Sequence, residues 1–342
     1  MYNLILIFSS ILIIFFLNNF IKKNKFLKNY NGQKHQAFVG KKDIPLTGGI
    51  FLFLASILVF YNFNQLFCIF LSLIFLVGLA SDTNYLSSPK IRFLLQCLIL
   101  FIFAIVFKLN IESTRIFFLD FFLNNIIFSF LFVTFCLLIV INGTNFIDGL
   151  NGLVLTYYLI ITIIIASFDL NFFLQLDDEK LNLLFFFLII ILVFNILDQL
   201  YIGDSGAYLL GFIFGVLLIM IYQNNQNISP FFIILLLWYP CFENLFSIIR
   251  KFKLKRSPLK PDNKHFHQLL FNFLQKKIKI KQIYLNNLTS FIIILYNLLI
   301  FKLATLNIYN TQYQVTLILI NIFIYVFIYL RLFNYFFKIN KK

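Results

Sequence analysis

Three aspartates stand at the ends of long apolar runs, among asparagines and glycines: Asp82, Asp148 and Asp204. Carboxylate and amide oxygens are the hard ligands that Mg²⁺ prefers, and Mg²⁺ usually completes its coordination with water and substrate phosphates. In "NGTNFIDGLNGL" (142–153), Asn145 stands three residues before Asp148, so on a helical turn both side chains face the same way. Each Asp-Gly or Gly-Asp pair taken singly is also ordinary turn chemistry.

A second polar cluster is basic and lies in "RSPLKPDNKHFHQLL" (256–270). His265 and His267 stand there beside Lys264 and Arg256. Lysine and arginine neutralise a diphosphate, and histidine can donate a hydrogen bond or a proton to it. Because the histidines are two residues apart, both lie on one side of an extended loop. The alternative is a basic loop that holds anionic lipid headgroups.

Long apolar segments must position these residues. The chain has 342 residues, of which 61% are hydrophobic and 12% charged, too apolar a composition for a soluble protein of this size. Crossing a bilayer takes about 17–25 apolar residues. Eleven runs approach that length: 2–20, 47–63, 65–80, 91–109, 126–141, 153–168, 181–197, 207–222, 231–249, 287–307 and 312–333. We therefore predict an all-α, polytopic membrane bundle of about eleven transmembrane helices, forming a single domain over residues 1–342.

The net charge of +15 orients this bundle. It does not indicate nucleic-acid binding, because the lysines are not on a soluble domain. With the N-terminus outside, all but four of the 28 Lys and Arg residues fall on the inner side, as the positive-inside rule requires. Five polar segments then share the inner face: 31–49, 78–92, 142–153, 201–211 and 256–270. We therefore predict a site assembled from loops on the cytoplasmic face.

One acidic residue lies inside a predicted span. Glu243 stands three residues after Pro240, and a proline inside a span frees a backbone carbonyl and kinks the helix. An unpaired glutamate there is costly, so we expect Glu243 to meet Arg250, another basic residue or water. A role in catalysis and a role in orienting the helix both stay open.

In this order, the motifs resemble those of the polyprenyl-phosphate N-acetylhexosamine-1-phosphate transferases (glycosyltransferase family 4). "NGTNFIDGLNGL" is similar to the family's Asn-x-x-Asn-x-x-Asp-Gly-x-Asp-Gly signature, and "IGDSGAYLLG" to its Gly-Asp-x-Gly-Ser-x-x-x-Gly. "SPLKPDNKHFHQLL", in the basic segment 250–286, resembles its His-x-His-His loop. The likeness covers about residues 30–270, and eleven spans fit the GlcNAc-type branch better than the muramoyl-pentapeptide branch.

The resemblance implies a reaction in which undecaprenyl phosphate attacks the β-phosphorus of a UDP-linked N-acetyl sugar and UMP leaves. The product would initiate a cell-envelope polysaccharide, such as O-antigen or a cell-wall glycan, in the bacterial inner membrane. Mg²⁺ is the implied cofactor, with Mn²⁺ as a substitute. The implied partners are the UDP-N-acetyl sugar, the lipid phosphate and the bilayer, and a homodimer is left open.

The resemblance also assigns roles to single residues. Asp204 and Asn145 would bind the metal ion, with Asp148 beside it and the nucleotide. Asp82 would orient or deprotonate the lipid phosphate, and His265 with His267 would hold the diphosphate. Further contacts to the nucleotide or cofactor are expected from four residues: Asn142, Asn195, Lys264 and Arg256.

Three positions depart from the family's pattern. Ser81 replaces the first of two adjacent aspartates in that pattern, and Asn151 replaces the second aspartate of Asp-Gly-x-Asp-Gly. Gln268 replaces the last histidine of the loop. Ser and Asn keep oxygen ligands but lose charge, so a lower Mg²⁺ affinity is expected. Two alternatives therefore stay open: a catalytically weakened homologue, and a transporter of lipid-linked sugar. A transporter should carry polar groups in the middle of several spans. The spans here are almost free of such groups, and Glu243 is the exception.

Overall fold

The structure is a computed structural model that describes residues 2–24, 27, 44–61, 64–170, 177–255, 257 and 264–337. Across those ranges every regular element is an α-helix, and there are fourteen of them. The helices are α1 (Tyr2–Asn24), α2 (Gly48–Phe60), α3 (Gln65–Asp82), α4 (Pro89–Val106), α5 (Phe117–Leu123), α6 (Ile126–Ile147), α7 (Leu153–Ser167), α8 (Asp178–Ile196), α9 (Gly203–Asn224), α10 (Pro230–Leu236), α11 (Trp238–Lys253), α12 (Phe266–Lys277), α13 (Gln282–Ala304) and α14 (Thr311–Phe337). The predicted all-α class is confirmed.

Within the described ranges, eight helices are long and apolar enough to cross a membrane: α1, α3, α4, α6, α8, α9, α13 and α14. α10 and α11 together form a further apolar stretch, bent by 80° at a short break, and α2 and α7 are shorter apolar helices. Each of the eleven predicted runs overlaps one of these helices or the bent pair. This is the architecture expected of a polytopic helical membrane protein.

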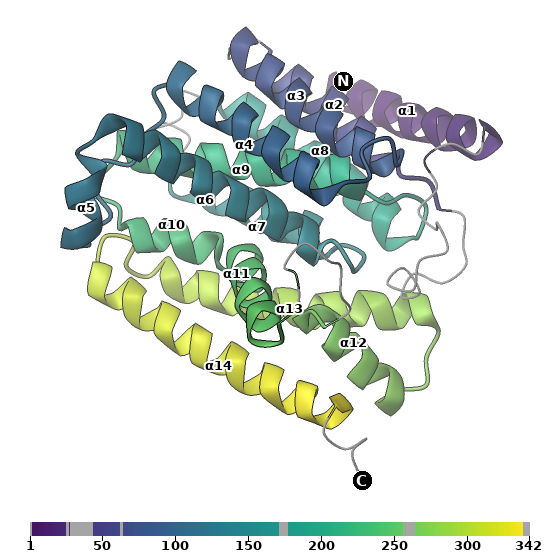
Figure 1. Ribbon diagram of the computed structural model, residues 1–342. Helices are drawn as coiled ribbons and strands as arrows, with labels where there is room; N and C mark the ends of the chain where they lie inside the picture. Colours follow the sequence, from purple (N-terminus) through teal and green to yellow (C-terminus); the bar gives the residue numbers. More distant parts are fainter. Residues whose placement is uncertain are drawn as a thin grey trace.

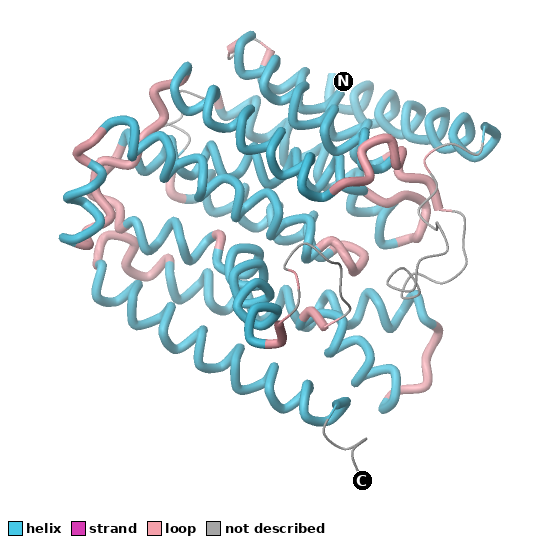
Figure 2. Tube along the Cα trace, in the orientation of Figure 1, coloured by secondary structure: helices cyan, strands magenta, loops and turns pink. Residues whose placement is uncertain are grey.

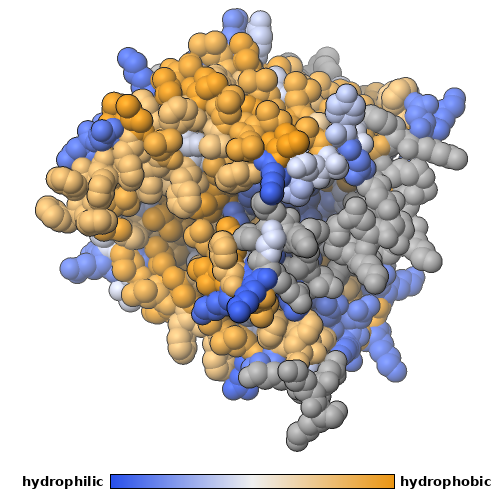
Figure 3. All heavy atoms as spheres, in the orientation of Figure 1, coloured by the Kyte–Doolittle hydropathy of each residue, from blue (hydrophilic) through white to orange (hydrophobic). Residues whose placement is uncertain are grey.

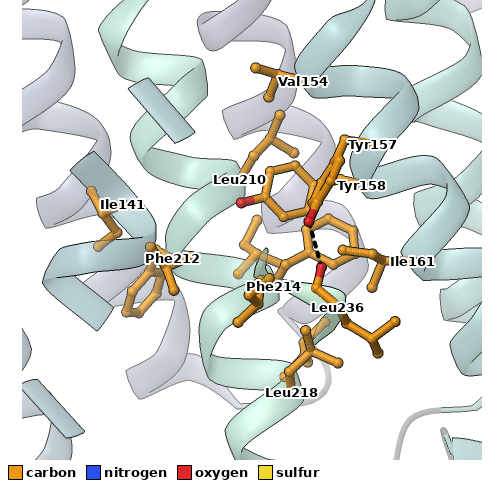
Figure 4. Packing of buried hydrophobic residues seen from close by; sticks show 14 of the residues in the cluster. Ile141, Val154, Tyr157, Tyr158, Ile161, Leu210, Phe212, Phe214, Leu218 and Leu236 are labelled. Atoms are coloured by element: carbon orange, nitrogen blue, oxygen red, sulfur yellow. Dashed lines mark hydrogen bonds between the residues drawn. The ribbon is translucent and has the colours of Figure 1, made fainter. Parts of the chain in front are cut away.

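The bend between α10 and α11 follows from Pro240, in the first turn of α11. A proline has no N–H to donate to the carbonyl four residues before it. That carbonyl belongs to Leu236, and it accepts a hydrogen bond from the Tyr157 hydroxyl at 2.8 Å instead (Figure 4). Gly143 of α6 packs against the same bend, because a Cβ there would overlap the Pro240 carbonyl oxygen. The kink predicted from Pro240 is therefore present.

α9 is the centre of the bundle. Of its span, 94% is buried inside the protein, against 22–44% for the other candidate spans. It packs against α2, α3 and α6 (Figure 1). Glycines permit the close approach: a Cβ on Gly211 would lie 2.7 Å from the Ile141 Cα of α6, and one on Gly78 of α3 would overlap the Ser205 Cα. α9 therefore holds its first turn in fixed register with α3 and α6.

Aromatic rings fill the core beside α9. Tyr158 of α7 stacks on Phe214 of α9 with ring centroids 4.5 Å apart, and its hydroxyl lies 2.5 Å from the Thr144 hydroxyl. Figure 4 shows Tyr157 beside it, reaching the Leu236 carbonyl. Burial of such rings stabilises the bundle, while their hydroxyls find partners inside it.

The connections between helices sort into two ends of the bundle (Figures 1 and 2). At one end, Arg115 donates to the carbonyls of residues 226–228 and to the Thr311 hydroxyl at 2.6 Å. At the other end, the Tyr201 N–H before α9 donates to the Pro45 carbonyl before α2 at 3.0 Å. Figure 3 shows apolar side chains over much of the flank between these ends. The described parts of the segments predicted to form the site gather at the second end.

Candidate active site

Asp82, the last residue of α3, caps the N-terminus of α9. Its Oδ1 accepts from the Asp204 N–H at 2.8 Å, and its Oδ2 accepts from the N–H and hydroxyl of Ser205 at 3.0 and 2.6 Å. Gly203 has φ +67°, and a Cβ there would lie 2.7 Å from Asp82 Oδ2, so the turn requires glycine. These bonds tie both carboxylate oxygens to the first turn of α9, and the predicted role of Asp82 toward a lipid phosphate stays a prediction.

Asp204 lies where α3, α4, α6 and α9 meet. Its Oδ1 accepts from Asn145 Nδ2 at 2.6 Å, and its Oδ2 accepts from Arg92 Nη1 at 2.7 Å and from the Ser81 hydroxyl. The Arg92 and Asp204 side chains are 21% and 28% exposed, so this ion pair borders solvent. The structure therefore brings the two predicted metal ligands together and adds a guanidinium to them.

Asp148 follows the last residue of α6, close to these groups. Burial, together with the charges of Asp204 and Asp82, raises the pKa of its carboxyl well above the usual range. Like charges disfavour ionisation of a neighbour, so the shift reports that the three carboxylates interact. We call this group the acidic cluster: Asp82, Asn145, Asp148 and Asp204, with Arg92.

The donors of the acidic cluster suit a hard divalent cation. Among the described residues, no three His, Cys, Asp or Glu side chains are spaced to hold a metal ion by themselves. Mg²⁺, however, is commonly bound by one or two carboxylates plus waters and substrate phosphates. Asp204 offers a carboxylate beside the Asn145 carboxamide, and the Asp148 carboxyl lies close enough to interact with the charge of Asp204. The residues therefore fit such an ion by their chemistry.

Glu243 lies inside α11, where it is 1% exposed and bonded through both oxygens. Its Oε1 lies 2.9 Å from His265 Nδ1 and accepts from the Phe266 N–H at 3.3 Å. Its Oε2 accepts from the Tyr325 hydroxyl of α14 at 2.5 Å. The basic partner that the sequence required is therefore His265, whereas Arg250 bonds elsewhere. The glutamate joins α11, the start of α12, and α14.

His267 is buried against the loop after Asp148. It is 1% exposed, its ring stacks on His265 with centroids 5.7 Å apart, and a Cβ on Gly149 would lie 2.5 Å from its Nε2. Burial, and then the neighbouring His265, lower its pKa to about 3, so the ring is neutral. Within the part of the chain that the structure describes, neither ring nitrogen has a hydrogen-bond partner. His267 packs onto Gly149, and its predicted contact with a diphosphate stays a prediction.

Two of the residues predicted to contact nucleotide or cofactor make hydrogen bonds within the protein. Asn195 is buried; its Oδ1 accepts from the Gly152 N–H at 2.6 Å, and its Nδ2 donates to the Leu200 carbonyl at 3.0 Å. Asn142 donates to Gln96 Oε1 at 3.0 Å and so joins α6 to α4. Both asparagines hold the loops around the acidic cluster in place.

The predicted contacts of the basic residues near His265 stay predictions. The Lys264 ammonium lies 4.5 Å from the centroid of the Phe337 ring, over α14. Gln268, at the position of the resembled loop's last histidine, accepts from the His265 N–H at 3.2 Å and caps α12. Arg256 lies outside the described residues.

Two charged residues to which the sequence analysis assigned no role also lie at the site. Asp198 Oδ1 accepts from Asn151 Nδ2 at 2.6 Å and from the Tyr201 hydroxyl at 3.0 Å. A carboxylate thus stands beside position 151, where the resembled signature has its second aspartate. Arg92 lies in the first turn of α4. Its signal in the sequence is a charge at the start of an apolar helix, which requires a partner near the membrane.

Comparisons with known proteins agree with this arrangement. The model of the family described as glycosyl transferase family 4 matches residues 64–222, a range that contains Asp82, Asn145, Asp148 and Asp204. An undecaprenyl-phosphate alpha-N-acetylglucosaminyl 1-phosphate transferase of Thermotoga maritima is 28% identical over 256 residues, covering 74% of this chain and 75% of that protein.

Two further relatives cover shorter stretches. A decaprenyl-phosphate N-acetylglucosaminephosphotransferase of Mycolicibacterium smegmatis is 29% identical over 155 residues, 38% of this chain and 37% of that protein. A probable undecaprenyl-phosphate N-acetylglucosaminyl 1-phosphate transferase of Bacillus subtilis is 30% identical over 153 residues, 42% of this chain and 41% of that protein.

Proposed function

The chain belongs to glycosyl transferase family 4, and we propose that it transfers an N-acetylhexosamine-1-phosphate from a UDP-sugar to undecaprenyl phosphate and releases UMP. The product initiates a cell-envelope polysaccharide. The observation that carries the proposal is the acidic cluster, in which Asp204 of α9 meets Asn145 of α6 and Arg92 of α4 within 2.7 Å. A phosphate-rich reaction needs such a cluster at the end of the bundle, where lipid and water meet.

We assign the metal ion of this reaction, Mg²⁺ or Mn²⁺, to Asp204 and Asn145, with Asp148 beside them. When bound, the ion would offset negative charge on the diphosphate and on the UMP leaving group. Asp82 acts indirectly, because its hydrogen bonds fix the turn that positions the Asp204 side chain. The carboxylate of Asp198 supports the loop at Asn151.

The chain's own residues position the phosphates. Arg92 is the guanidinium at the solvent border of the cluster, and a guanidinium pairs with phosphate in a bidentate manner. A phosphate monoester has a second pKa of about 6, so the lipid phosphate is mostly ionised near neutral pH and needs no strong base. Positioning and electrostatic stabilisation, not proton abstraction, are therefore the work of the site.

We further propose eleven spans, with the N-terminus outside and the acidic cluster on the cytoplasmic side of the bacterial plasma membrane. The charge distribution of the sequence supports this topology, since all but four of the 28 Lys and Arg residues fall on the inner side when the N-terminus is outside. Arg115 lies at the opposite end. Accessibility of single cysteines placed in the α5 and α12 regions to an impermeant thiol reagent tests the orientation.

The activity is tested with protein in nanodiscs that contain undecaprenyl phosphate. With Mg²⁺ and UDP-GlcNAc, or another UDP-N-acetylhexosamine of a panel, UMP should be released, and labelled UMP should exchange back into the UDP-sugar. Chelation of the divalent ion should stop both. Absence of UMP release across the panel would contradict the proposal, and movement of preformed lipid-linked sugar across the bilayer without UMP release would identify a transporter.

A further inference from the structure

The histidine segment (residues 264–268) is held by a helix that lies beyond the region matched by the family. Tyr325 of α14 donates to Glu243 Oε2 at 2.5 Å, and Glu243 Oε1 lies 2.9 Å from His265 Nδ1. All three residues are buried, with 4%, 1% and 6% of their surfaces exposed. A chain of contacts therefore runs from the C-terminal helix through α11 to the ring of His265.

A second set of contacts, one helical turn further along α14, holds the backbone of the same segment. Tyr329 donates to the Lys264 carbonyl at 3.0 Å and accepts from Arg250 Nη1 at 3.0 Å, while Arg250 itself donates to the Lys264 carbonyl at 2.7 Å. Tyr325 and Tyr329 are four residues apart, and their rings stack with centroids 6.1 Å apart. α14 therefore fixes both the ring of His265 and the backbone just before it.

The contacts made by His265 limit how it can act. Its Nδ1 faces the Glu243 carboxylate, so a phosphate could be met only through Nε2. A carboxylate behind an imidazole sets which nitrogen carries the proton and which way the ring points. The other side of His265 packs on Phe146, with ring centroids 5.2 Å apart, and Phe146 is the residue after Asn145 of the acidic cluster. The ring therefore packs on α6 at the residue next to Asn145 of the cluster.

We propose that α14 is the positioning element of the transferase site, with Tyr325 acting through Glu243 to fix the ring of His265 beside the acidic cluster. The inference rests on the proposed transfer for its functional part. Tyr325 and Glu243 are positioning residues, because neither is placed to touch substrate. His265 is the residue they direct toward a phosphate of the sugar nucleotide or of the lipid.

The first test reads the imidazole directly and needs no turnover. The chain has 3 histidines, so protein labelled with ¹⁵N-histidine gives few ring signals, and the loss of signals in His265→Asn assigns that residue. In the wild type, His265 should show a proton on Nδ1 with the downfield shift of a hydrogen bond to carboxylate. Glu243→Leu should remove this signature and Tyr325→Phe should move it. Wild-type His265 signals in both variants would overturn the proposal.

The second test is kinetic and uses a matched control. Tyr296→Phe also removes one tyrosine hydroxyl from a contact with α14, since Tyr296 donates to Asn321 Oδ1, but it lies away from His265. Tyr325→Phe should lower kcat by about 10-fold with little change in KM, whereas Tyr296→Phe should leave kcat within about twofold. Equal kcat values for the two variants would overturn the proposal.

The two tests separate the two proposals. If the wild type releases no UMP from any UDP-sugar while the ¹⁵N signature responds to Glu243→Leu and Tyr325→Phe, the transferase proposal fails and the positioning of His265 stands. If UMP is released and the signature ignores both variants, the transferase stands and the role of α14 fails.

Discussion

The acidic cluster and the Glu243 network are both polar groups at the membrane boundary, but their charges are arranged in opposite ways. In the cluster, burial and then the charges of Asp204 and Asp82 raise the pKa of Asp148. In the network, the Glu243 oxygens are matched by His265, the Phe266 N–H and Tyr325. A satisfied network gives rigidity, whereas a group of like charges favours the arrival of a cation. The acidic cluster therefore suits the binding of a cation, and the Glu243 network suits the fixing of side chains in place.

The largest effect should come from Asp204→Asn. The amide removes the charge that pairs with Arg92 and that would hold the divalent ion, so UMP release should fall by about 100-fold or more, given the several kcal/mol of charge stabilisation that such an ion supplies. Asp120→Asn, at the opposite end of the bundle, is the control and should turn over normally. Near-normal rates in Asp204→Asn would place the metal elsewhere.

A smaller effect is expected where the two regions touch. Gly149→Ala would place a Cβ 2.5 Å from the buried ring of His267, so the histidine segment must shift away from the cluster. We expect a loss of about 1–3 kcal/mol in stability, seen as a lower melting temperature, and slower turnover. His267→Ala, added to Gly149→Ala, should restore part of the stability in a double-mutant cycle. Additive losses would show that the regions are independent.

Asp148→Asn should change stability by a modest amount that depends on pH. Because the folded protein raises the pKa of Asp148, folding of the wild type is penalised as pH rises above the ordinary carboxyl pKa, fully so above the raised value. Asp148→Asn should therefore raise the melting temperature by a few degrees at neutral pH and not in acid. A gain that persists unchanged in acid would contradict this origin.

Asp120, at the other end of the bundle, has a pKa shifted in the opposite direction to that of Asp148. Burial opposes ionisation there, but hydrogen bonds from Thr114 and Ser113 prevail and lower its pKa. Its contribution to stability is present above the ordinary carboxyl pKa and is lost as pH falls through the lowered value. Asp120→Asn should therefore lower the melting temperature at neutral pH, opposite in sign to Asp148→Asn.

The smallest effect is expected from Ser81→Asp, which restores the acidic pair of the resembled family. Arg92 Nη1 already donates to both the Ser81 hydroxyl and Asp204 Oδ2. The same guanidinium can therefore pair with a second carboxylate at position 81. UMP release should stay equal or improve by about threefold at limiting Mg²⁺, since an added ligand charge strengthens binding of a hard cation. A large loss of activity would show that the serine hydroxyl has its own role.

Much of this arrangement could be predicted from local signals. Apolar runs gave the helices, and Pro240 gave the bend. The positive-inside rule predicted the side of the membrane on which each loop lies, and it placed Asp82, Asp148 and Asp204 at the same end. The sequence did not reveal the pairing of Arg92 with Asp204 or of Tyr325 with Glu243, because such contacts join residues 112 and 82 positions apart and leave no period or spacing.

The roles of single residues were harder to predict from the sequence than the place of the site. Asn195 and His267 have side chains that suit substrate as well as they suit backbone or packing contacts. Only burial separates these uses, and Asn195 and His267 are 5% and 1% exposed. Polarity in a loop at the membrane boundary therefore indicates where a site lies more reliably than which of its side chains touches substrate.

Because α9 presents almost no surface to lipid, acyl chains cannot press on it directly. A thinner or more fluid bilayer would first tilt peripheral helices such as α1, of which 22% is buried. Asp204, on the first turn of α9, borders solvent but belongs to a helix that lipid scarcely touches. The enzyme's response to temperature-driven changes in fatty-acid composition should therefore come through access of the lipid substrate, while the geometry around that carboxylate stays constant.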